Sequence, residues 1–66
     1  MKDSARYMVL VQKGTATTSP ALEVPRAEAW RIARNLRAAG DRVYIMRLDP
    51  ESAKCVVAGD EPLPED

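Results

Sequence analysis

Three stretches of the chain carry clustered apolar and β-branched residues, as β-strands do. They are residues 6–13 (RYMVLVQK), 41–48 (DRVYIMRL) and 53–59 (AKCVVAG). Lys13 and Gly14 could also close a tight hairpin, with residues 15–18 (TATT) as a short additional strand. Residues 49–52 (DPES) predict a type I turn, which would join the last two strands into a hairpin.

Residues 26–39 predict an amphipathic helix between the first two strands. Its apolar stripe contains Ala29, Ile32, Ala33, Leu36 and Ala39. Pro25 suits the first helical turn, and Gly40 is the expected left-handed stop. The order is then β-α-β-β, in which a helix between the first two strands favours a parallel, right-handed crossover if they share a sheet. We therefore predict an α+β domain with one helix on a three-stranded sheet, or a four-stranded one if the hairpin forms.

The strands place apolar side chains on both faces of this sheet. In the first strand alternation sets Tyr7, Val9 and Val11 against Met8 and Leu10, and in the second it sets Val43 and Ile45 against Tyr44, Met46 and Leu48. The same alternation puts Cys55 and Val57 on one face, with Cys55 as a buried structural thiol. One helix covers one face only, so the second face needs a partner, a dimer mate, or the tail or the loop at 14–25 folded over it. A partner or a dimer is the favoured alternative.

The formal net charge is zero, but the charges are segregated along the chain. Residues 26–47 hold six arginines against two acids, a balance of +4. Residues 48–66 hold six acids against one lysine, a balance of −5. We divide the chain into a compact domain at 1–59 and an acidic, proline-rich tail at 60–66. The tail is expected to be disordered or loosely docked, or else to fold back on the arginines of the helix.

Trp30, the single tryptophan, lies roughly 120° from the centre of the predicted apolar stripe. Its neighbours at helical spacing are Arg26, Arg34 and Arg37. In one interpretation the ring covers the edge of the sheet, with arginine stems along it. In another, the four residues form a partner-binding patch, since Trp and Arg are enriched at interface hot spots. In a third, the arginines contact phosphates and Trp30 stacks on an unpaired base.

Catalytic, metal-binding and cofactor-binding patterns are absent from the sequence. The chain has no histidine, no phosphate-binding loop of the P-loop type and one cysteine, which cannot form an internal disulfide. Cys55 has no imidazole to activate it as a nucleophile. We predict a non-enzymatic protein with no metal site and no cofactor. No segment has the length of a bilayer span or the pattern of a secretory signal, so we expect a cytoplasmic protein without membrane contact.

Residues 28–46 (EAWRIARNLRAAGDRVYIM) resemble the helix-then-strand half of the SPOR peptidoglycan-binding repeat. The shared pattern is Ala and Leu at helical spacing, then a Gly, then an alternating strand. A full domain of that family has two such repeats and this chain has one, so we do not assign the chain to it. A homodimer would supply the second half.

The leading functional hypothesis is a small protein-binding module that occupies a surface of a larger protein. An inhibitor of the kind that phages or mobile elements encode is one form of it. The first alternative is a nucleic-acid-binding module that uses the arginines of the helix, which the zero net charge disfavours. The second alternative is a homodimeric assembly protein.

Overall fold

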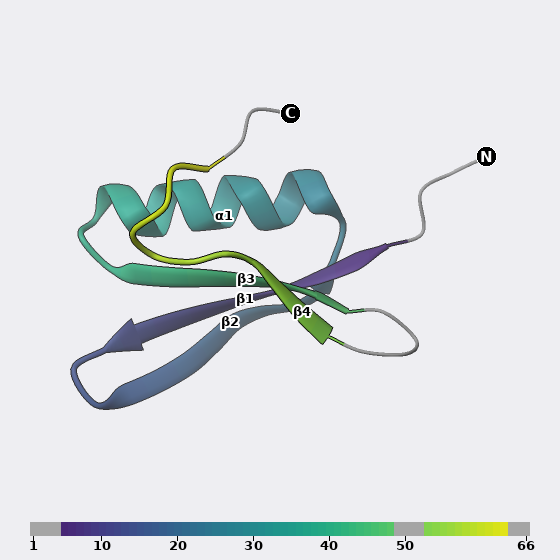
Figure 1. Ribbon diagram of the computed structural model, residues 1–66. Helices are drawn as coiled ribbons and strands as arrows, with labels where there is room; N and C mark the ends of the chain where they lie inside the picture. Colours follow the sequence, from purple (N-terminus) through teal and green to yellow (C-terminus); the bar gives the residue numbers. More distant parts are fainter. Residues whose placement is uncertain (1–4, 49–52, 64–66) are drawn as a thin grey trace.

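The computed structural model describes residues 5–48 and 53–63. One helix lies across one side of a four-stranded antiparallel sheet, which confirms the predicted α+β class (Figure 1). The elements in chain order are β1 (Arg6–Lys13), β2 (Ala16–Val24), α1 (Arg26–Ala38), β3 (Arg42–Leu48) and β4 (Ala53–Val57). The strands lie side by side in the order β2-β1-β3-β4.

The hairpin at Gly14 forms, and its second strand is longer than the predicted four residues. β2 has nine residues and pairs with β1 from Lys13 opposite Ala16 to Tyr7 opposite Val24. Gly14 has a φ of 62° at the first position of a two-residue loop, which is typical of a type II′ turn. The sequence did not predict the full length of β2, because Ser19, Pro20 and Glu23 are unusual in strands.

Two bulges let β2 accommodate these residues. The pairing with β1 shifts between Tyr7 and Val9 and again between Val9 and Val11. Glu23, within the first shifted segment, has a φ of 54°. A bulged edge strand tolerates proline and left-handed residues because part of its backbone is unpaired.

The predicted parallel crossover is wrong: β1 and β3 are antiparallel, with Val9 opposite Ile45. The reason is the unexpected length of β2, which carries the chain back along β1 before the helix begins. α1 then returns the chain, and β3 enters the sheet opposed to β1.

Both ends of α1 follow the sequence signals. Pro25 is the N-cap, with φ −64° and ψ 162°, and its carbonyl accepts a 2.9 Å hydrogen bond from the Ala29 amide. At the other end Gly40 has a φ of 97°. The Gly40 amide donates to the Arg37 carbonyl and the Asp41 amide to the Leu36 carbonyl, which is the Schellman pattern.

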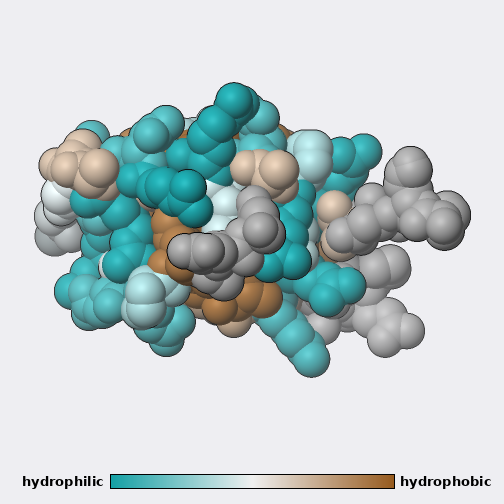
Figure 2. Space-filling view, turned by 90° about the horizontal axis from the view of Figure 1, so that it is seen from above, coloured by the Kyte–Doolittle hydropathy of each residue, from teal (hydrophilic) through white to brown (hydrophobic). Residues whose placement is uncertain are grey.

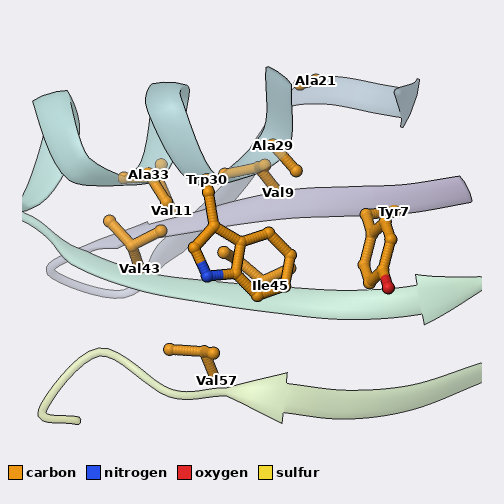
Figure 3. Packing of buried hydrophobic residues seen from close by; sticks show 10 residues of the cluster. All are labelled: Tyr7, Val9, Val11, Ala21, Ala29, Trp30, Ala33, Val43, Ile45 and Val57. Carbon is orange, nitrogen blue, oxygen red and sulfur yellow. The ribbon is translucent and has the colours of Figure 1, made fainter. Parts of the chain in front are cut away.

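The core lies between α1 and the sheet. Among the described residues, the buried ones that form it are Tyr7, Val9, Val11, Ala21, Ala29, Trp30, Ala33, Val43, Ile45 and Val57 (Figure 3). Ala29 and Ala33 are fully buried, and their small side chains let the helix approach the central strands closely. The predicted stripe is partly right, because Ile32 and Leu36 are half-buried at its margin and Ala39 is exposed.

β3 and β4 form the predicted antiparallel hairpin, but the predicted alternation in β4 is wrong. Val57 pairs with Ile45 and Cys55 pairs with Met46, so an irregularity at Val56 places Cys55 and Val57 on opposite faces. Val57 is buried under the helix, whereas Cys55 is exposed rather than a buried thiol. The predicted turn at 49–52 lies outside the described residues.

The chain after β4 returns to the helix side of the molecule (Figure 1). Gly59 lies so close to β3 that a Cβ there would be 2.4 Å from the Arg42 Cγ and 2.9 Å from the Val43 nitrogen. Asp60 forms a 3.3 Å ion pair with Arg42, and Leu63 packs against the core. The described part of the predicted tail is therefore docked.

Candidate functional site

Trp30, which belongs to the predicted partner-binding patch of Trp30, Arg26, Arg34 and Arg37, is buried, with 4% of its surface exposed. Its ring meets Tyr7 edge-on, with 5.1 Å between the ring centroids. Figure 3 shows that the Trp30 ring extends from α1 over Ile45, with Val43 and Val57 close by. This arrangement corresponds to the edge-cover interpretation, in which Trp30 closes the core above β3 and β4.

The buried face of α1 is otherwise made of small residues. Ala29 and Ala33 are fully buried, and Ile32 and Leu36 lie half-buried at the margin of the core. The large Trp30 side chain widens this face and belongs to the same buried cluster as Val57. The buried face of α1 is therefore centred nearer Ala33 than the hydrophobic pattern alone indicates.

The three arginines of the patch lie in different environments. The Arg26 guanidinium sits 5.1 Å from the centroid of the Trp30 ring, a cation–π distance. Arg37 is half-buried and donates a hydrogen bond to the Glu61 carbonyl. Arg34 is exposed. The structure thus gathers Arg26 and Trp30, uses Arg37 to hold the tail, and leaves Arg34 on the outer surface.

The indole Nε1 of Trp30 is buried and has no hydrogen-bond acceptor within residues 5–48 and 53–63. A buried donor without an acceptor costs about 1–3 kcal/mol. The aromatic contact with Tyr7 and the large buried area offset this cost.

Several other charges among the described residues form ion pairs. Arg31 and Glu28 form an ion pair at 2.6 Å on the outer face of α1, and Lys13 lies 3.8 Å from Asp41. Figure 2 shows that the surface on the helix side is largely hydrophilic, with some apolar atoms exposed between the hydrophilic groups. Arg31 and Arg42 remain largely exposed although each forms an ion pair, with 68% and 52% of their side-chain surface accessible.

A row of hydrogen-bonded polar side chains crosses one end of the sheet. Arg42 hydrogen-bonds to Tyr44, and this contact, with the nearby Asp60 carboxylate, raises the pKa of Arg42 above its ordinary value. The Tyr44 hydroxyl donates to Gln12 Oε1 at 3.2 Å. Gln12 and Arg42 are direct cross-strand neighbours, so these groups form a polar border at that end.

The opposite face of the sheet, which we call the open face, is apolar. Met8 pairs with Met46 and Leu10 with Tyr44 across β1 and β3, and all four are only half-buried. Cys55 extends the Met8–Met46 row onto β4. On β2, Leu22 follows the inward-facing Ala21 and is 60% exposed.

Among residues 5–48 and 53–63, no segment covers the open face. Residues 16–24 are a strand of the sheet itself, and residues 58–63 run to the helix side. The two segments that the sequence offered as covers therefore lie elsewhere, at least as far as residue 63. The sequence predicted this second apolar face, because apolar residues alternate on both sides of the strands. It offered a fourth strand before the helix only as an alternative.

Groups that could carry chemistry are sparse in the part of the chain that the structure describes. No three His, Cys, Asp or Glu side chains gather there as a metal-binding group. The Cys55 thiol contacts the Val57 carbonyl at 3.5 Å. No helix in the described ranges is long and apolar enough to cross a membrane.

The comparisons with known proteins give no relative: no protein-family model, no curated protein and no solved structure matches the chain.

Proposed function

We propose that this protein is a small non-enzymatic protein-binding module whose binding surface is the open face. The observation that supports the proposal is the partly exposed apolar surface formed by Met8, Leu10, Tyr44 and Met46. Removing such a surface from water is favourable by about 25 cal/mol per Å² of apolar area. Contiguous exposed apolar patches on small domains mark sites of protein contact.

The borders of the open face have the composition of an interface rim. The described residues at its centre, Met8 paired with Met46 and Leu10 paired with Tyr44, are uncharged, whereas Gln12 and Arg42 lie at one end and Arg6 at the other. Protein interfaces combine an apolar, water-excluding centre with a polar rim, and Met and Tyr are enriched in them. The face therefore suits a protein surface better than a nucleic acid, which requires accessible positive charge.

The open face replaces the Trp30 patch as our preferred surface because of burial. A ring that is 4% exposed contributes little contact area to a partner. Trp30→Ala would also remove a core residue, so a loss of binding in that variant would have two explanations. Arg34→Ala tests the outer surface of the helix without disturbing the core, since Arg34 is exposed.

The test is affinity capture with the tagged full chain from cells that also express an untagged copy. Leu22→Lys places a charge at an exposed position of β2, in the segment opposite Met8 of the open face, and Ala27→Lys places the same charge on the exposed surface of α1. We expect proteins captured by the wild type and by Ala27→Lys to be lost with Leu22→Lys. Capture that survives Leu22→Lys and fails with Arg34→Ala would overturn the proposal in favour of the helix surface.

A further inference from the structure

We infer that the occupant of the open face is a second copy of this chain, in an isologous sheet-on-sheet dimer. This inference rests on the proposed function, because it assigns a partner to the same surface. The dimer would bring Met8, Leu10, Tyr44 and Met46 of each copy against those of the other, with the helices on the two outer sides.

The first support is the absence of charge at the centre of the face. In an isologous contact each surface meets itself, so a charged side chain near the symmetry axis meets its like. The central cross-strand pairs, Met8 with Met46 and Leu10 with Tyr44, are uncharged. Homodimer interfaces are also more apolar than contacts between independently stable proteins.

The second support is the charge of the whole chain. Ten basic and ten acidic residues give a formal net charge of zero, so two copies have no net repulsion to overcome. Proteins with little net charge associate more readily than strongly charged ones. The Arg42–Asp60 ion pair lies at the border of the open face and not at its centre.

The third support is the size of the face. Four strands at ~4.8 Å spacing and about seven residues at ~3.3 Å give a flat footprint of roughly 400 Å². Protruding side chains enlarge the accessible area, so stacking two copies buries on the order of 1,000 Å² in total, the lower bound of a specific interface. We therefore expect a dimer that dissociates in the micromolar range.

The shape of the side chains suits such packing. Two sheets stack about 10 Å apart with their inner side chains interdigitated. Met8 and Met46 are flexible and unbranched, so they adjust to fill irregular gaps between the layers. Cys55, in the same cross-strand row, would be partly covered by the second copy.

The test is sedimentation velocity of the purified full chain from ~1 to ~500 µM, the range around the expected dissociation constant. A reducing agent is included so that a Cys55 disulfide cannot join two copies. We expect the mass to rise from monomer to dimer for the wild type and for Ala27→Lys. For Met46→Lys we expect the midpoint to shift at least about tenfold higher in concentration.

Two further measurements keep the result interpretable. Fluorescence emission from the buried Trp30 reports whether each variant is folded. If Met46→Lys is not folded, Leu22→Lys replaces it in the sedimentation experiment. Modification of Cys55 by a thiol reagent should slow as the wild-type concentration rises, and should not slow in Met46→Lys.

A wild type that stays monomeric over the whole range would overturn the dimer. It would leave the proposed function standing if capture of another protein is lost with Leu22→Lys. A dimer that Met46→Lys and Leu22→Lys both leave intact would overturn the assignment of this face.

Discussion

Trp30 shows how a single residue changes meaning between sequence and structure. Its angular position among arginines indicates a surface residue, yet its ring is buried against Tyr7. Arg26 covers the outer side of the ring, so the apolar body is shielded even at the margin of the core. At this scale Arg26 serves packing, and a buried Trp30 offers little surface to a partner.

Replacing Trp30 should therefore affect stability first. We expect Trp30→Ala to lower the free energy of unfolding by about 3–5 kcal/mol, the usual cost of truncating a buried aromatic residue. Trp30→Phe should cost less, because it keeps a ring against Tyr7 and removes the buried Nε1 donor, which has no acceptor in the described ranges. Urea denaturation followed by circular dichroism measures both. Equal losses for Ala and Phe would contradict the packing role.

At the scale of elements, the ends of α1 are determined locally and the strand edges are not. Pro25 and Gly40 act through their own backbone preferences, so both were readable from the sequence. The irregularity at Val56 has no comparable local signal, because it depends on how β4 pairs with β3. This is why the predicted helix boundaries are right and the predicted face of Cys55 is wrong.

The helix stop at Gly40 can be tested by substitution. A φ of 97° is strained for any residue with a Cβ, so Gly40→Ala should lower the free energy of unfolding by about 1–3 kcal/mol. Gly40→Asn is the control, since Asn tolerates positive φ better and should cost less. Thermal or chemical denaturation measures the difference. If the two variants are equally stable, the left-handed conformation does not limit this position.

At the scale of the whole molecule, the docked segment from Ala58 to Leu63 joins β4 to the helix side. Its contacts with the rest of the described chain include the ion pair of Asp60 with Arg42, the hydrogen bond of Arg37 to the Glu61 carbonyl, and the packing of Leu63. One prediction from the sequence was that the acidic tail folds back on the arginines of the helix. Arg37 does contact the tail, but through the Glu61 backbone carbonyl and not through an acidic side chain, and Asp60 pairs with Arg42, which was not among the candidates.

Gly59 is the position on which this docking depends. Gly59→Ala would bring a Cβ within 2.4 Å of the Arg42 side chain, so the segment must move away from β3. We expect a loss of about 1–3 kcal/mol, typical of overpacking, and faster amide exchange at Glu61. The control is Asp60→Ala, which removes an exposed ion pair and should change stability by less than about 1 kcal/mol. A larger effect of Asp60→Ala would mean that charge, rather than close approach, holds the segment.

The sequence by itself determined the fold class, the limits of α1, the β3–β4 hairpin and the apolar character of both sheet faces. These features follow from residue spacing and from local backbone preferences, which act over a few positions. Only the tertiary structure decided that β1 and β3 are antiparallel, that Trp30 turns inward, that Cys55 is exposed and that residues 58–63 run to the helix side, away from the open face. Each of these depends on pairing or packing between segments far apart in the chain, where small local signals are outweighed by the burial of the shared core.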